Sequence, residues 1–160
     1  MSSRRQLNTS FLFCLILLAT TVLLPANLSG QTGETPSPTL YEQLGGYDVL
    51  ARFVDTAFPR VASHPDLSRL FRGHSLDSQR RQRQLIVDAL CSASGGPCIY
   101  TGRDLRSVHE GLDISASDWT SFMGVISATA REFMFPEEVE QRFLAMFEDF
   151  QEVVVLKNDG

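Results

Sequence analysis

The stretch LRSVHEGL, residues 105–112, decides how the rest of the chain is interpreted. Leu105, Val108 and Leu112 follow one another at helical spacing, which predicts a short helix with one buried apolar face. His109 falls on the same face, four residues after Leu105. Burying an imidazole without a partner costs about 1–3 kcal/mol, so a partner must lie on the buried side. Either a backbone carbonyl satisfies His109 in an ordinary core, or His109 binds a metal or a cofactor.

The sequence on both sides of this stretch predicts helices and no credible sheet. Asp66 is expected to cap a short turn at residues 66–71. Glycine pairs at residues 45–46 and 95–96 interrupt the helical pattern. The folded part is therefore expected to be all-α, with helices of unequal length. Apolar residues recur at helical spacing in residues 47–65, 76–91, 115–135 and 136–156.

Residues 1–30 have the features of an export signal. Arg4 and Arg5 precede the apolar run FLFCLILLATTVLLP, and small and polar residues follow it. The run is shorter than the roughly 20 apolar residues that a membrane-spanning helix needs. No clean cleavage motif is present, so an uncleaved membrane anchor is the alternative to a cleaved signal peptide. The residues SRRQL also resemble a twin-arginine export signal.

The rest of the chain divides into a linker, one folded domain and a tail. Residues 31–39 read as a linker, 40–156 as the domain and 157–160 as the tail. The net charge of −5 argues against nucleic acid as a partner. An exported protein is expected, periplasmic or otherwise extracytoplasmic, with membrane contact only if residues 1–30 are retained. In such a protein Cys91 and Cys98 either pair in a disulfide or remain free thiols.

The few histidines favour a haem over a bare metal ion. His64, His74 and His109 are the only three, and no C-x-x-C, H-x-x-x-H or C-x-x-C-H motif is present. A bare ion needs three or four protein ligands, whereas a haem iron needs one because the porphyrin supplies four. One histidine that faces a pocket rich in Phe, Leu, Ile and Val therefore suits a haem.

Four segments, taken in order and spacing, resemble the group I truncated haemoglobins. The resemblance runs from Leu40 to about Val155 and implies a shortened globin, a two-over-two helical sandwich around a non-covalent iron protoporphyrin. It also implies that His109 is the proximal ligand of the haem iron. The segments are LYEQLGG (40–46), LFRGHSLDSQRR (70–81), GGPCIYTGRDLRSVHEGL (95–112) and DISASDWTSF (113–122).

The resemblance implies roles for several aromatic residues. Phe71 corresponds to the phenylalanine that globins stack on the porphyrin. Phe58 stands where this family often has a tyrosine whose hydroxyl bonds the bound ligand, so that hydroxyl is missing here. Tyr100 belongs to the GGP-x-x-Y-x-G motif and is expected to bind the cofactor. His74 is expected at the surface or beside a haem propionate.

The helix predicted at residues 76–91 is the distal helix that the resemblance implies, and it offers three polar residues toward the haem. Gln79, Gln82 and Arg83 are spaced i, i+3 and i+4, and they share a predicted face with Ile86, Val87 and Leu90. Gln79 is expected to donate a hydrogen bond to bound ligand, with Gln82 and Arg83 as alternatives. Arg83 can instead pair with a haem propionate. An ordinary solvated face is the other interpretation of this run.

Two classes of function follow from the resemblance. The first is a binding protein that captures O₂, or CO and NO, reversibly for oxygen storage, transport or sensing. The second is an enzyme that oxidises nitric oxide with bound O₂ or turns over like a peroxidase. The enzyme needs an external reductase, because nothing in the chain resembles a flavin or nicotinamide domain. This favours the binding class. A haem-free helical domain would require that His109 bind nothing.

Overall fold

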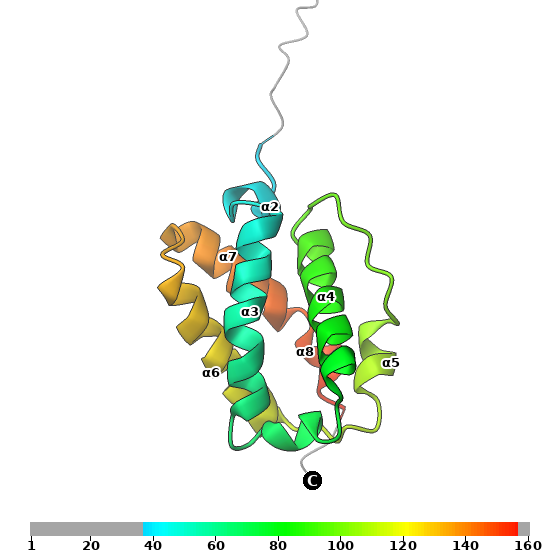
Figure 1. The fold of residues 1–160 in the computed structure, drawn as a ribbon. Helices are drawn as coiled ribbons and strands as arrows, with labels where there is room; N and C mark the ends of the chain where they lie inside the picture. Colours follow the sequence, from blue (N-terminus) through cyan, green and yellow to red (C-terminus); the bar gives the residue numbers. More distant parts are fainter. Residues whose placement is uncertain (1–36, 157–160) are drawn as a thin grey trace, which may run out of the picture. The chain divides into compact units, whose positions relative to one another are not determined.

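The computed structural model describes residues 37–156 (Figure 1). The predicted signal at residues 1–30, most of the predicted linker and the predicted tail at 157–160 lie outside the described residues. Within residues 37–156 no helix is long and apolar enough to cross a bilayer.

The described residues form helices and no strand, which confirms the all-α prediction. Ser75 and Ser115 cap two of the longer helices with their side chains, as expected for serine at an N-cap. The predicted cap at Asp66 is wrong: a 3₁₀ helix begins at Ser68, and the Asp66 carboxylate instead accepts a hydrogen bond from Ser121. The elements are α2 (Leu40–Gln43), α3 (Tyr47–Ser63), η1 (Ser68–Phe71), α4 (Leu76–Ala93), α5 (Leu105–His109), α6 (Ala116–Glu132), α7 (Glu137–Glu148) and α8 (Gln151–Val154).

Two pairs of long helices make up the body of the domain. In Figure 1, α3 and α4 run side by side, and α6 and α7 form a second pair that α3 contacts through α6. Between the pairs, Phe53 of α3 and Phe143 of α7 are fully buried, with ring centroids 4.9 Å apart. Burial of such large apolar side chains is the main stabilising contribution to this contact.

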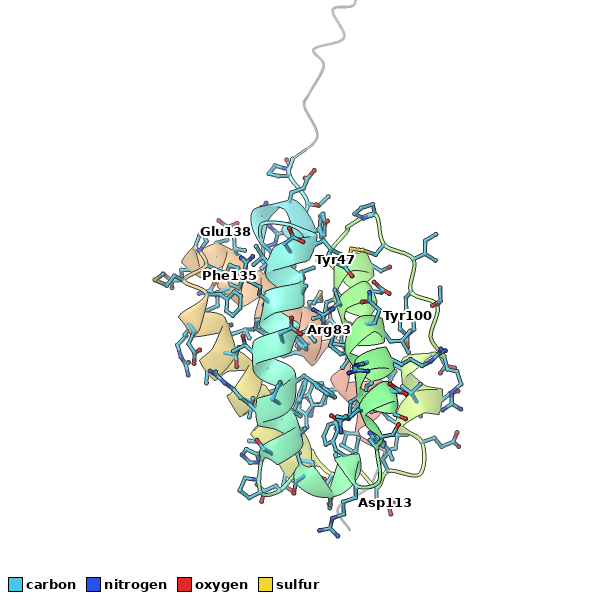
Figure 2. All side chains as sticks on the ribbon, viewed as in Figure 1. Tyr47, Arg83, Tyr100, Asp113, Phe135 and Glu138 are labelled. Atoms are coloured by element: carbon cyan, nitrogen blue, oxygen red, sulfur yellow. A yellow bond between two sulfur atoms is a disulfide. The ribbon has the colours of Figure 1, made fainter. Side chains whose placement is uncertain are left out.

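Two ion pairs join α3 to its neighbours. Arg60 forms a bidentate pair with Glu132 of α6. Arg83 of α4 forms a second bidentate pair with Asp55 of α3, at 2.8 Å for both bonds (Figure 2). The guanidinium of Arg83 is therefore directed between α3 and α4.

A disulfide closes the turn after α4. Cys91 and Cys98 are bonded, with their Cα atoms 5.7 Å apart. Gly96 lies between them, where an added Cβ would come within 2.8 Å of the Cys91 carbonyl oxygen and 2.6 Å of the Tyr41 ring. Only glycine fits that close approach.

Candidate functional site

An apolar cavity of about 360 Å³ lies inside the domain. Its walls come from every described element except α2. Most lining side chains are aliphatic or aromatic, and four carry a titratable or amide group: His74, Gln82, His109 and Asp118. A cavity of this kind, apolar with a few polar groups, is typical of a small-molecule or cofactor site.

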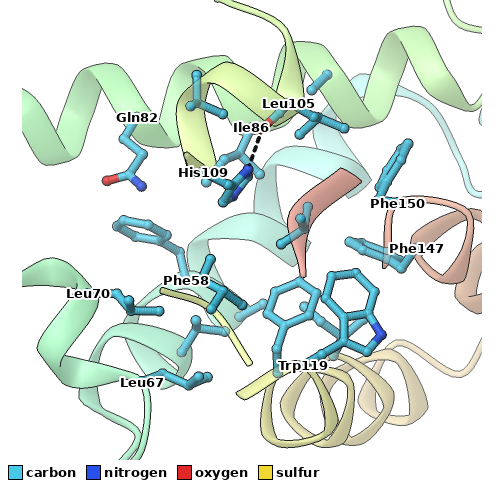
Figure 3. Close-up of a pocket in the computed structure, with 18 of the residues that line it drawn as sticks. Phe58, Leu67, Leu70, Gln82, Ile86, Leu105, His109, Trp119, Phe147 and Phe150 are labelled. Atoms are coloured by element: carbon cyan, nitrogen blue, oxygen red, sulfur yellow. Dashed lines mark hydrogen bonds between the residues drawn. The ribbon is translucent and has the colours of Figure 1, made fainter. Parts of the chain in front are cut away.

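His109 lines this cavity, and within residues 37–156 no hydrogen bond reaches its Nε2 atom. It is the last residue of α5, a helix whose start Asp104 caps by accepting a bond from the Ser107 amide at 2.9 Å. The Nδ1 atom of His109 lies 2.7 Å from the Leu105 carbonyl oxygen (Figure 3). Because a carbonyl only accepts, Nδ1 carries the hydrogen of this bond, which leaves Nε2 as the ring atom available to a ligand. A ring fixed in this way is suited to bind a metal through Nε2.

The distal wall is formed by one stripe of α4. The lining residues Gln82, Ile86, Ala89 and Leu90 follow the i, i+4, i+7, i+8 pattern of a single helix face. Gln82 is half-buried, and its Oε1 atom is buried without a hydrogen-bond partner among the described residues. Figure 3 shows its amide group beside the cavity. An orphaned polar atom of this kind is a place where a bound molecule would supply the partner.

Three other residues expected on this wall lie elsewhere. Gln79 is exposed, and its amide donates to the His74 carbonyl at 3.2 Å. Arg83 is paired with Asp55 on the side that faces α3. Val87 is fully buried in the core between the helices. None of the three lines the cavity.

The aromatic residues divide in the same way. Phe58 of α3 and Phe71 of η1 both line the cavity and meet edge to face, with ring centroids 5.6 Å apart. Tyr100 does not line it: its hydroxyl donates to the Arg103 carbonyl at 2.7 Å, and its ring folds over Gly102.

Sequence reasoning missed Asp118, a buried carboxylate at the edge of the cavity. Burial opposes its ionisation, but hydrogen bonds from the Ser115 amide and hydroxyl and from the Arg69 guanidinium outweigh this and lower the pKa of Asp118. Asp118 also completes the capping box that starts α6. The Ser115-to-Asp118 spacing is the signal from which this position can be found.

The cavity opens beside a second, more exposed hollow, which is lined by cationic side chains. The two share Leu70, His74 and Leu112, and the outer one adds Arg69, Arg72 and Asp113. Arg69 is committed to Asp118 at 2.5 Å, whereas Arg72 forms no ion pair within residues 37–156. The mouth of the cavity is therefore the place where an acidic group of a bound molecule would meet a free guanidinium.

These residues fit a haem. The cavity is apolar where a porphyrin would lie, and its wall includes the imidazole of His109. The cationic side chains of Arg69 and Arg72 lie at one end of it, beside His74. A haem has the complementary chemistry, with an iron that takes one protein ligand and two acidic side chains at one edge.

Comparison with known proteins identifies relatives among the globins. The profile of the bacterial-like globins matches residues 39–155. The chain is similar to a group 1 truncated haemoglobin of Tetrahymena thermophila, 24% identical over 102 residues that cover 64% of this chain and 82% of the relative. It is also similar to the group 2 truncated haemoglobin YjbI of Bacillus subtilis, 33% identical over 119 residues that cover 66% and 83%.

The fold is shared with solved truncated haemoglobins. The Fe(III) form of the Tetrahymena pyriformis protein superposes with a TM-score of 0.67 at 21% identity, covering 76% of this chain and all of that one. The expected two-over-two globin fold is therefore confirmed.

Proposed function

This chain belongs to the bacterial-like globin family, and we propose on that basis that it holds a haem in the cavity and binds O₂ reversibly. Other diatomic gases, such as CO and NO, would bind at the same place. The role that follows is oxygen storage or transport. The single observation that carries the proposal is the imidazole of His109, which lines an apolar cavity and whose Nε2 atom has no hydrogen-bond partner among the described residues.

When bound, the haem supplies an iron that accepts one protein ligand and one exchangeable gas. His109 provides the protein ligand, and its bond to the Leu105 carbonyl fixes the orientation of the ring. Phe58 and Phe71, which line the cavity, would pack against the cofactor and exclude water. Gln82 brings the amide that can donate a hydrogen bond to the gas.

Arg72 and His74 are the residues we assign to the haem propionates. Both stand at the exposed end of the cavity, where carboxylates keep contact with water. A guanidinium pairs well with a carboxylate because it offers parallel donors. Arg83, which was an alternative for this role, is engaged with Asp55.

Absorption spectra of the purified chain test the proposal. The ferrous protein should show haem bands that shift on exposure to O₂ and to CO and that return when the gas is removed. His109→Gly should abolish the native spectrum because the iron loses its protein ligand, and added imidazole should restore it. His64→Gly is the matched control, because His64 does not line the cavity.

Two results would contradict the proposal. A His109→Gly variant with an unchanged spectrum and unchanged gas-binding rates would exclude His109 as the ligand. A protein that consumes O₂ and NO catalytically with an added reductase, and that releases no free O₂, would instead be an enzyme.

A further inference from the structure

We propose that the Cys91–Cys98 disulfide is a redox-responsive clamp that sets how firmly the cavity holds its haem. The inference rests on the haem-binding function proposed above. It concerns retention of the cofactor and not the choice of gas.

The disulfide connects the two walls of the cavity through their neighbours in the chain. Cys91 is fully buried in α4, directly after Ala89 and Leu90, which line the distal wall. Cys98 is half-buried, and residues 99–104 lead from it to α5 without regular secondary structure. The covalent bond therefore places the start of the segment that presents His109 relative to α4.

Few other contacts place that segment. Within residues 37–156 no hydrogen bond joins residues 97–104 to any element but α5, into which they lead. The helix α5 has five residues, none of them buried, and it packs against α8. The bond from the Arg106 guanidinium to the Glu152 carbonyl is long, at 3.5 Å.

The turn between the cysteines, unlike the segment that follows Cys98, is held by hydrogen bonds to α4 and α2. Ser94 donates to the Leu90 carbonyl at 2.7 Å, Gly96 donates to the Cys91 carbonyl at 2.8 Å, and the Tyr41 amide donates to the Ser94 carbonyl at 2.8 Å. These bonds do not depend on the disulfide. What the disulfide adds is therefore the placement of Cys98 and of the residues that follow it.

Opening the clamp is a two-electron reaction with an external dithiol. A thiolate of the dithiol attacks the sulfur of Cys98, the less buried of the two, and the Cys91 sulfur leaves and takes up a proton. The second thiol of the reductant then displaces Cys98 and becomes part of the reductant's own disulfide. The protein gains two electrons and two protons and ends with two thiols.

Thermodynamic linkage makes the proposal quantitative. If the closed disulfide strengthens haem binding by some factor, bound haem must stabilise the closed disulfide by the same factor. A tenfold difference in haem affinity corresponds to about 30 mV in the potential of this two-electron couple. The ratio of the haem affinities of the oxidised and reduced protein must therefore agree with the shift in disulfide potential that haem causes.

The experiment follows haem loss from the full chain to an excess of a haem-scavenging protein. All proteins carry Cys14→Ser, so that Cys91 and Cys98 are the only cysteines. We expect loss about tenfold faster from the parent after reduction with dithiothreitol than from the oxidised parent. Cys98→Ser should lose haem at the fast rate with or without dithiothreitol. The disulfide potential should be about 30 mV lower with haem than without it.

Equal rates from the oxidised and reduced parent would overturn the clamp while leaving the haem-binding function in place. Acceleration of haem loss from Cys98→Ser by dithiothreitol would also overturn it, because the reductant would then act on the iron. Absence of haem bands from every protein would instead refute the proposed function itself. If Cys98→Ser fails to fold, the parent in its two redox states still decides the question.

Discussion

Gln82 is the residue of the distal wall on which gas binding should depend most. Phe58 lines the cavity with a ring that carries no hydroxyl, so it offers no hydrogen-bond donor. The amide of Gln82 is half-buried, and its Oε1 atom lacks a partner in the described residues. The other atom of this amide, Nε2, carries the hydrogens, so it is the group that can donate to bound O₂ in the cavity that Gln82 lines.

Gln82→Leu should speed the dissociation of O₂ by about tenfold or more, because a hydrogen bond to a partly charged acceptor contributes about 1.5–3 kcal/mol. CO dissociation should change by severalfold at most, since bound CO carries less charge. Stopped-flow dissociation of both gases measures this. Gln79→Leu is the matched control and should leave both rates unchanged, because Gln79 is exposed and bonded to the His74 carbonyl. The opposite ranking of the two variants would reassign the distal donor to Gln79.

Asp118 makes the stability of the domain depend on pH. Its pKa is lowered in the folded state because hydrogen bonds from Ser115 and Arg69 outweigh the effect of burial. The stabilisation is therefore fully present above the ordinary pKa of an aspartate and is lost as the pH falls through the lower, folded-state value. Asp118→Asn should lower the free energy of unfolding by about 2 kcal/mol at pH 7.

Urea denaturation at several pH values measures this difference. It should shrink steadily once the pH falls below about 3.9, the ordinary value for aspartate. A difference that stays constant from pH 7 to pH 3 would show that the carboxylate charge contributes nothing.

At the scale of single elements, α4 shows what the sequence predicts and what it leaves open. The helix follows from the apolar spacing at residues 76–91. Which face of the helix lines the cavity is harder to predict, because residues 79 to 90 carry polar and apolar side chains around most of the circumference. On an ideal helix Arg83 and Val87 lie about 100° and 140° from Gln82, which is enough to turn them from the cavity toward α3.

Gln79 illustrates a different limit. It lies about 60° around the helix from Gln82, so its direction is compatible with the cavity, but it stands about 4.5 Å further along the axis. Only tertiary packing determines how far α4 extends past the cavity. The apolar stripe of Ile86, Ala89 and Leu90, extended by one turn toward the N-terminus, indicates Gln82 and not Gln79.

Two glycines, Gly96 in the turn after α4 and Gly124 in α6, should respond to alanine in opposite ways. Gly96→Ala places a methyl group within 2.8 Å of the Cys91 carbonyl and 2.6 Å of the Tyr41 ring, so it should destabilise the domain by about 1–3 kcal/mol. Gly124→Ala meets nothing within 4 Å at an exposed position of α6, so it should stabilise by about 0.5–1 kcal/mol. Thermal melts of the two variants measure both signs. Equal destabilisation would mean that helix propensity at Gly124 is offset elsewhere.

At the scale of the whole molecule, composition and helical spacing predict an all-α domain, and the motif order predicts the globin arrangement that the structure has. The shared cavity depends on contacts between distant segments. Ile114, Phe147 and Val154 line it from three parts of the chain, and no local pattern marks them as neighbours.

We propose that the chain is exported, because basic, apolar and small-residue regions occur in signal order at residues 1–30. The mature N-terminus should then fall near residues 27–31. Intact-mass measurement of protein from the native cell envelope checks this. A full-length chain that starts at Met1 in the soluble cytoplasmic fraction would contradict it.

The position of Trp119 gives the molecule an optical reporter. It is the single tryptophan of the chain, it is 7% exposed, and it lines the cavity. A porphyrin absorbs at the wavelengths where an indole emits. A haem in this cavity would therefore quench the fluorescence of Trp119 by energy transfer. The tryptophan fluorescence of the unlabelled protein should therefore be weak when haem fills the cavity and strong when the cavity is empty. The rate at which the fluorescence recovers then measures the rate of haem loss.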